Sequence, residues 1–316
     1  MEYNKNVKDM VPGDKVEGFY ILKEAYQKIS SNGKPFLSAV IADKTGTMDV
    51  KVWDYAGPVG TQEDVGKIIK IRGDVSEFKG NPQLSLSNIR MALPEDNCDT
   101  VRLVAAAPID KDETVRKVRA LVDSMEDPDY RQVARTMLER HLETFASIPA
   151  AKSVHHSFLS GLLMHTANMM AMADFLSGQY ASVIDRSLLL TGTLLHDFAK
   201  EIEFRFSDLG IVTDYSVKGQ LLGHLVRGAQ EVAQVCAELG TPEEKSLLLQ
   251  HMILSHHGEP EYGAAVKPMF AEAELLSYID MVDSRMEIYA ELLPSVAEGS
   301  FSSRVFALDK RIYHHG

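Results

Sequence analysis

The sequence predicts a two-domain α+β chain, with a small antiparallel β-barrel first and an all-α domain after it. Its 316 residues are more than one hydrophobic core usually supports. Segments within the first 93 residues alternate apolar and polar side chains, whereas after residue 110 apolar residues recur at three- and four-residue spacing. We place the domains at residues 1–95 and 151–316, with residues 96–150 forming a linker and helices that pack on the second domain.

Five or six short strands are expected in the first domain. The sequences SNGKP, DKTG and FKGNPQ separate them, and their glycine, proline and asparagine residues favour tight turns. Apart from a short helix near residues 60–65, this region shows no helical pattern. The expected strands cover residues 15–22, 36–42, 48–53, 66–75 and 84–89.

The sequence PEDNCD at residues 94–99 marks the boundary, and a helical period follows it. Apolar residues then return once per helical turn in seven segments, which indicates helices with one buried face. We expect these helices at residues 114–124, 128–143, 156–177, 185–200, 219–239, 242–255 and 271–290, with another near Ser303.

Composition narrows the class of protein. The chain is 45% hydrophobic and 25% charged, which argues against disordered and fibrous proteins. Its polar N-terminus and the lack of a long apolar run predict no signal peptide and no membrane span, and the two cysteines lack CxxC spacing. We therefore expect a cytoplasmic protein without a disulfide framework or thiolate zinc site. The assembly state is left open, a homo-oligomer included.

The net charge of −12 argues against a basic surface that wraps duplex DNA. Residues 1–95 carry 13 basic and 13 acidic side chains, so the remaining 20 basic and 32 acidic residues hold the whole deficit. The neutral first domain is thus the better place for a nucleic acid to bind. The acidic second domain would repel a polyanion unless metal ions or local basic groups offset its charge.

Histidine and aspartate residues recur through the helical half in a pattern that suggests a divalent-metal site for phosphoester hydrolysis. Imidazole and carboxylate ligands suit Mn, Fe, Mg, Co or Zn. Neighbouring helical residues point about 100° apart, so His196 and Asp197 converge only if their helix ends close to the metal, leaving Asp197 free to bridge two ions. Lys200 returns to the face of that pair. The pattern comprises His165, His196-Asp197, His224, His256-His257 and Asp280.

The segments HHSFLSGLLMHT, LLHDFAK, KGQLLGH, ILSHHG and AELLSYIDMVD resemble the HD-domain metal-dependent phosphohydrolase superfamily over about residues 150–290. The resemblance implies a first metal site and a second one completed by His224 and His256, with His257 as the alternative to His256. It also implies that Lys200 could stabilise the scissile phosphate and that Asp197 is the catalytic ligand. The implied core ligands are His165, His196, Asp197 and Asp280.

The sequence departs from the usual pattern of that superfamily in three places, and none of these departures removes a ligand. Met164 and Lys218 stand where an acidic residue is commoner, and HDFAK replaces the commoner HDIGK. Lys218 could alter contacts with the substrate.

Other polar residues of this half are weighed individually. His155 and His156 could cap a helix or contact phosphate or metal, with a plain surface role as the rival interpretation. Asp283 could support a ligand by hydrogen bonding, against a surface or salt-bridged carboxylate. We expect no ligand role for His141, His251, His314 and His315.

The strings GKPFL, DKTGTMDVKVWD, GKIIKIRGDV and GNPQLSL resemble the nucleic-acid-binding OB-fold family over about residues 14–92. Such barrels bind single strands by stacking bases on aromatic side chains in a positive groove. Each aromatic side chain could instead pack in the barrel core. We expect Phe36 and Phe78 to be more exposed than Trp53. A barrel that binds protein is the alternative to one that binds nucleic acid. The candidates are Phe36, Trp53, Tyr55 and Phe78, with Lys34, Lys51, Arg72 and Lys79.

The barrel and the helical half together resemble YhaM-type 3′→5′ exoribonucleases. This resemblance implies stepwise degradation of single-stranded RNA, and often DNA, from the 3′ end with Mn²⁺, with two ions expected and Mg²⁺, Co²⁺ or Fe²⁺ as alternatives. Two rival interpretations remain. One is an HD phosphohydrolase of nucleotides or cyclic dinucleotides, and the other is a non-catalytic RNA-binding adaptor whose helical half is only structural.

Overall fold

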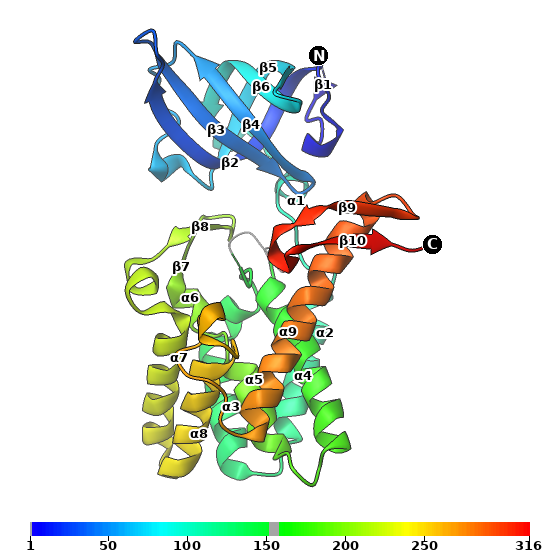
Figure 1. Cartoon of the computed structure of the whole chain (residues 1–316). Helices are drawn as coiled ribbons and strands as arrows, with labels where there is room; N and C mark the ends of the chain where they lie inside the picture. The colour runs from blue at the N-terminus through cyan, green and yellow to red at the C-terminus, as the bar shows by residue number, and fades with distance from the viewer. Residues whose placement is uncertain (1, 152–157) are drawn as a thin grey trace. The chain divides into compact units, whose positions relative to one another are not determined.

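The computed structural model describes residues 2–151 and 158–316, and the expectations for His155 and His156 lie outside them. The chain divides into two compact units (Figure 1). One unit holds residues 1–106 together with 206–213, and the other holds residues 107–205 and 214–316.

The first unit is a closed β-barrel. Its strands follow the order β1-β2-β3-β4-β6-β5, and β2 also pairs with β5, which closes the sheet on itself. The pairings are antiparallel except for β4 with β6 and the short β1 with β2. The barrel predicted from the sequence is confirmed. Its strands are β1 (Glu2–Tyr3), β2 (Lys15–Ile29), β3 (Pro35–Asp43), β4 (Gly46–Trp53), β5 (Ile68–Phe78) and β6 (Asn81–Met91).

Strand β2 is about twice as long as the sequence indicates, because it serves two neighbours. Its first half, from Lys15 to Ile21, pairs with β5, and its second half pairs with β3. Most side chains after Leu22 are exposed, so the alternating pattern fades there although the backbone continues. Alternate residues of β3, β4 and β5 point inward and form one apolar core.

Short elements flank the barrel strands. A single turn of helix, η2 (Gln62–Asp64), lies where the short helix is expected. The small helix α1 (Thr100–Leu103) carries Arg102, which pairs with Asp43 of β3 at 3.5 Å. The remaining turns of helix in this unit are η1 (Val7–Asp9) and η3 (Pro94–Asp96).

The second unit is helical, as predicted. None of its described helices, nor any other in the described chain, has the length and apolar character needed to cross a bilayer. Helix α5 is buried from Ser187 to Leu195, and Gly192 lets the side chain of Met252 in α8 approach it closely. The helices are α2 (Lys111–Asp123), α3 (Pro128–Phe145), α4 (Gly161–Gln179), α5 (Arg186–Leu195), α6 (Lys200–Glu203), α7 (Val217–Leu239), α8 (Glu243–Ser255) and α9 (Ala271–Leu292).

Two β-hairpins were not predicted, and the helix expected near Ser303 is wrong. Residues 300–314 form an antiparallel hairpin beside the end of α9 (Figure 1). A small core of Ile288, Leu308 and Ile312 holds it there, so tertiary packing overrides the weak helical pattern. The hairpins are β7 (Phe204–Phe206) with β8 (Val212–Tyr215), and β9 (Ser300–Val305) with β10 (Lys310–His314); single turns η4 (Pro260–Tyr262), η5 (Leu293–Ser295) and η6 (Phe306–Leu308) complete the chain.

Candidate metal centre

Six elements of the helical unit bring the predicted histidines and aspartates to one place. His165 lies on α4 and Asp280 on α9, while the other ligand candidates lie at helix ends or kinks. At such positions, side chains from several helices can point toward one common centre. His196 and Asp197 follow α5, Lys200 begins α6, His224 follows a kink in α7, and His256 and His257 follow α8.

The adjacent pair His196-Asp197 converges because α5 ends at Leu195. The predicted helix over residues 185–200 is therefore interrupted, and residues 196–199 form a turn before α6. Within this turn, His196 Nε2 lies 3.2 Å from Asp197 Oδ2. Both side chains are almost completely buried.

One group of ligand atoms surrounds His165. Its Nε2 atom lies 3.3 Å from His196 Nε2 and 3.5 Å from Asp280 Oδ1. Asp197 Oδ2 is 3.9 Å from the same nitrogen. His165, His196 and Asp280 could together hold one metal ion.

A second group of ligand atoms faces the other oxygen of Asp197. His224 Nε2 lies 3.5 Å and His256 Nε2 lies 3.7 Å from Asp197 Oδ1. His257 is close as well, since atoms of His224, His256 and His257 lie within 4.8 Å of one another. Asp197 therefore contacts both groups, one with each carboxylate oxygen.

The four best-placed histidines share one orientation. Each directs Nδ1 to an oxygen acceptor, which requires the proton on Nδ1 and leaves the Nε2 lone pair available for a metal. This arrangement of supported imidazoles is usual around protein-bound metals. The pairs are His165 with Asp283 Oδ2 at 2.7 Å, His196 with Thr193 O at 2.8 Å, His224 with Glu203 Oε2 at 3.0 Å, and His256 with Ile253 O at 2.8 Å.

Four buried polar atoms of this centre have no hydrogen-bond partner among the described residues. They are Asp197 Oδ1, His224 Nε2, His256 Nε2 and His257 Nδ1. Leaving a buried polar atom without a partner costs about 1–3 kcal/mol, so a cluster of four needs a compensating ligand. A divalent cation satisfies this donor set, and both His256 and His257 offer it a nitrogen.

Oppositely charged groups of the centre stabilise each other's charged forms. Burial alone would raise the pKa of Asp197, but the charge of Lys200 holds it well below its usual range. Burial also opposes the charged form of Lys200, yet Asp197 raises its pKa. Burial and the neighbouring His257 hold the pKa of His256 well below its ordinary value, which keeps this imidazole in the neutral form that metals bind.

Two acidic residues orient the histidines. Glu203, at the end of α6, was not singled out from the sequence, since nothing in the motif spacing pairs it with His224. Asp283 was weighed as a supporting carboxylate, and it is 8% exposed with its Oδ2 at His165 Nδ1. By contrast, His141 is held between two glutamates away from the ligands.

On the barrel, the structure brings several of the predicted strand-binding residues onto one face of β2, β3 and β4. Phe36 stacks on Trp53, with ring centroids 5.1 Å apart, and Lys51 lies over the Phe36 ring. Register adds Tyr26 and Lys28, because Ser38 pairs with Tyr26 and Phe36 pairs with Lys28. We call these five residues, Tyr26, Lys28, Phe36, Lys51 and Trp53, the aromatic face.

Exposure on this face differs from the expectation. Trp53 is 58% exposed, about as much as Phe78 at 56%, while Phe36 is half-buried beneath it. The predicted ranking of Phe36 above Trp53 is wrong, because Phe36 has a strand on each side, at Lys28 and at Trp53, whereas β4 pairs with β6 only at residues 49–51. Lys34 pairs with Asp54 at 2.9 Å beside the face.

The remaining barrel candidates lie elsewhere. Phe78 ends β5 and Lys79 lies in the turn to β6. Asn81, the first residue of β6, lines a depression with Thr47, at the end of β4 away from Trp53. Tyr55 packs against the barrel core, with its hydroxyl accepting a hydrogen bond from the Val59 N–H.

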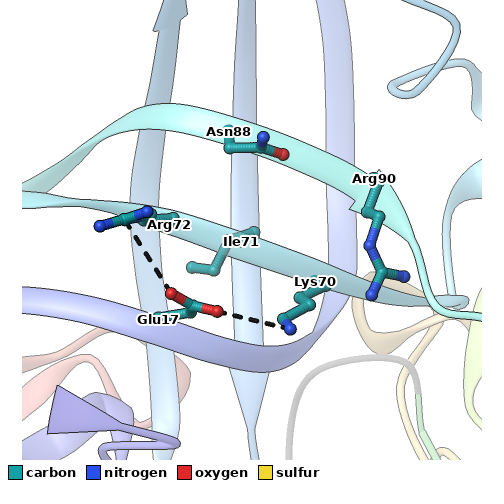
Figure 2. Close-up of a pocket in the computed structure, with 6 residues that line it drawn as sticks. All are labelled: Glu17, Lys70, Ile71, Arg72, Asn88 and Arg90. Carbon is teal, nitrogen blue, oxygen red and sulfur yellow. Dashed lines mark ion pairs between the residues drawn. The ribbon is translucent and has the colours of Figure 1, made fainter. Parts of the chain in front are cut away.

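Arg72 lies on a different face, built by β2, β5 and β6 (Figure 2). A shallow cavity of about 200 Å³ there is lined by Lys70, Arg72 and Arg90. Its basic side chains are paired: Glu17 lies 3.4 Å from Lys70 and 3.9 Å from Arg72. Arg90 pairs with Asp96 at 2.7 Å.

Comparisons with known proteins agree with the folds described for the two halves of the chain. Residues 162–285 match the HD domain family, and residues 21–92 match a family described as OB-fold nucleic acid binding domain. This chain joins an OB-fold domain to an HD domain. HD domains are metal-dependent phosphohydrolases, and the OB-fold partner indicates a nucleic-acid-related phosphohydrolase.

Solved structures with similarity to this chain include two archaeal proteins. A domain of replication protein A from Methanococcus maripaludis is 20% identical, covers 28% of this chain and 94% of its own, and has a TM-score of 0.25. An OB domain from Thermoplasma acidophilum is 15% identical, covers 34% of this chain and 94% of its own, and has a TM-score of 0.24.

Proposed function

We propose that this protein is a metal-dependent 3′→5′ exonuclease that hydrolyses single-stranded RNA and, by the same chemistry, single-stranded DNA. The observation that carries the proposal is the buried carboxylate of Asp197, whose two oxygens face separate groups of histidine nitrogens. Such a bridging carboxylate is suited to holding two divalent ions close together.

The geometry supports two ligand sets. One ion would be held by His165, His196, Asp197 and Asp280, and the other by Asp197, His224 and His256 or His257. Nitrogen and oxygen ligands of this kind accept Mn²⁺, and also Mg²⁺, Co²⁺ or Fe²⁺. When bound, such ions lower the pKa of water and offset the charge of a phosphate under attack.

Lys200 contributes a permanent positive charge to the centre. Its Nζ lies 2.6 Å from Asp197 Oδ2, and its side chain is only 14% exposed. Because Asp197 raises its pKa, Lys200 stays protonated across the physiological range. It orients Asp197 and has further N–H donors for a phosphate oxygen.

A polymeric substrate is supported by the aromatic face. Base stacking on aromatic side chains contributes roughly 1–3 kcal/mol per base and tolerates any sequence. The exposed ring of Trp53, stacked on Phe36 with Lys51 beside it, has the residue types that this mode of binding uses. Residues 1–95 would hold the strand, and residues 151–316 would hydrolyse its 3′ end.

The test compares 5′-labelled and 3′-labelled single strands incubated with the full chain and Mn²⁺. We expect a ladder from the 5′-labelled strand and immediate release of mononucleotide from the 3′-labelled one. Asp197→Ala should lower hydrolysis at least roughly 1,000-fold, since several kcal/mol of charge stabilisation are lost. The matched control is Asp123→Ala, at an exposed carboxylate that pairs with Arg135. Full activity of Asp197→Ala would overturn the assignment.

A second candidate is an HD phosphohydrolase of free nucleotides or cyclic dinucleotides. A cavity of about 490 Å³ beside the centre favours it, because this volume accommodates a nucleotide. Rapid turnover of free nucleotides, with oligonucleotides of either label left intact, would select this function. A protein that binds strands without hydrolysing any of these substrates, and that carries no metal, would be an RNA-binding adaptor.

A further inference from the structure

A cavity of about 490 Å³ opens directly beside the metal centre. His256, His257 and Asp280 of the centre form part of its lining. From there one wall follows a single face of α9, since Ser284 and Ile288 come one and two helical turns after Asp280. A molecule bound in this cavity would therefore contact the candidate metal ligands.

Another wall comes from the C-terminal hairpin. Ala307, Leu308 and Asp309 contribute to it, and Leu308 is also part of the small core with Ile288 and Ile312. Because this core fixes the hairpin on α9, the wall has a defined position relative to the centre (Figure 1). The cavity is thus a built feature of the helical unit.

The lining combines apolar surface with a few polar groups. Met281, Ile288 and Leu308 supply apolar contact, and Tyr262 on η4 presents an aromatic side chain that is 69% exposed. The cation in the lining is Arg285, which makes no ion pair within residues 2–151 and 158–316. The acidic Asp309 is paired with Arg304, so its charge is offset.

We propose that this cavity binds the 3′-terminal nucleotide of the strand, and this rests on the proposed exonuclease function. Tyr262 stacks on the base, and Arg285 donates hydrogen bonds to phosphate oxygens of that nucleotide. Three observations carry the assignment: the cavity adjoins the ligands, its volume suits one nucleotide, and its lining supplies an aromatic ring and an uncommitted guanidinium.

The first experiment measures equilibrium binding of adenosine 5′-monophosphate to the full chain with Mn²⁺. Arg285→Gln and Tyr262→Ala should each weaken binding about ten-fold, because each removes one directional contact. Arg285→Lys should recover part of the loss, since it keeps the charge without the planar fork. Controls are Arg119→Gln, at an exposed arginine paired with Glu139, and Tyr278→Ala, at an exposed ring outside the cavity.

The second experiment measures hydrolysis of a 5′-labelled single strand by the same variants. We expect the loss in Arg285→Gln and Tyr262→Ala to fall mainly on KM, by about ten-fold. Wild-type binding of the mononucleotide by both variants, with unchanged KM, would overturn the subsite while leaving the exonuclease proposal intact. Binding that depends on Arg285 in a chain that hydrolyses no strand would show that the cavity binds nucleotides, and would refute both the exonuclease and the assignment of the cavity to a strand's 3′ end.

Discussion

Four candidate ligands of the metal centre, His165, His196, His224 and His256, are each held at Nδ1 by an oxygen from the surrounding chain. For His196 and His256 the acceptor is a carbonyl three residues earlier, so the helix end itself orients the ring. For His165 and His224 the acceptors are carboxylates, Asp283 and Glu203. Partners of this kind usually change metal affinity 10–100-fold when removed, which makes the two carboxylates testable without altering a ligand.

Glu203→Ala should weaken binding of the ion that contacts His224 and leave binding of the other ion unchanged. The side chain of Glu203 accepts hydrogen bonds from both the backbone N–H and Nδ1 of His224, so its removal frees that ring. We expect about 10–100-fold weaker binding of one Mn²⁺ per chain by titration calorimetry. Glu203→Gln keeps an acceptor and should lose less, and Glu139→Ala serves as a surface control. Unchanged affinity for both ions would show that Glu203 has no such role.

His141 gives a pH-dependent contribution to stability that is separate from the metal. Glu201 and Glu231 hydrogen-bond to its two ring nitrogens and outweigh the effect of burial, which raises its pKa to about 9. A group whose pKa is raised on folding stabilises the protein fully below its unfolded pKa, here about 6.5. The contribution is lost as the pH rises through about 9.

His141→Gln should therefore destabilise the protein more at pH 6.5 than at pH 9.5. We expect a loss of roughly 2 kcal/mol in the free energy of unfolding at the lower pH, the size of charged hydrogen bonds, and less at the higher pH. Urea unfolding of the metal-free chain at both pH values measures this difference. The exposed His315→Gln should show no such trend, and a loss that grows with pH would contradict the interpretation.

At the scale of elements, helix ends place the ligands. Helix α7 is interrupted at Gly223, whose φ of 67° and ψ of 171° are almost exclusive to glycine. After this kink the backbone N–H of His224 reaches Glu203 at 3.2 Å, and its ring turns to Asp197. A continuous helix would direct His224 elsewhere.

Gly223→Ala should cost about 1–3 kcal/mol of stability, because a Cβ is strained at this backbone conformation. If the kink straightens to relieve the strain, His224 moves and the second ion binds more weakly. Thermal unfolding and Mn²⁺ stoichiometry measure the two effects together. Gly178→Ala is the matched control, since it lies in α4 with nothing within 4 Å of an added Cβ. Equal behaviour of the two variants would rule out a role for the kink.

At the scale of the whole molecule, charge is divided unevenly between the domains. The first 95 residues are neutral in sum, while the rest carries the acidic excess. We therefore expect Trp53 and its neighbours to supply strand affinity mainly by stacking, and the salt dependence of binding to be modest for a nucleic-acid-binding protein.

Trp53→Ala should weaken binding of a single-stranded oligonucleotide about ten-fold or more, because a stacking platform of roughly 1–3 kcal/mol is removed. Fluorescence anisotropy with the full chain at two salt concentrations measures the affinity and its slope. Tyr3→Ala, at another exposed aromatic residue of the same barrel, should bind like the wild type. A larger loss in Tyr3→Ala than in Trp53→Ala would move the strand to another face of the barrel.

Local patterns in the chain were enough for the two folds and for the identity of the clustered residues. Alternation of side chains specifies strands, a period of 3.6 specifies helices, and both depend only on near neighbours. The residues from His165 to Asp280 carry side chains that few other roles require together. Lys200 could be placed beside Asp197 for the same reason, since three residues span one helical turn.

Tertiary structure decided which segments pack together and how they orient the side chains of the site. The end of α5 at Leu195, the support of His224 by Glu203, and the hairpin at residues 300–314 depend on packing between segments far apart in sequence. Tyr26 and Lys28 likewise join the aromatic face only through strand register. The sequence alone thus predicted the candidate metal ligands and part of the candidate strand-binding set. Only the fold decided which atoms of those residues meet, because convergence in space is set by contacts that no local pattern encodes.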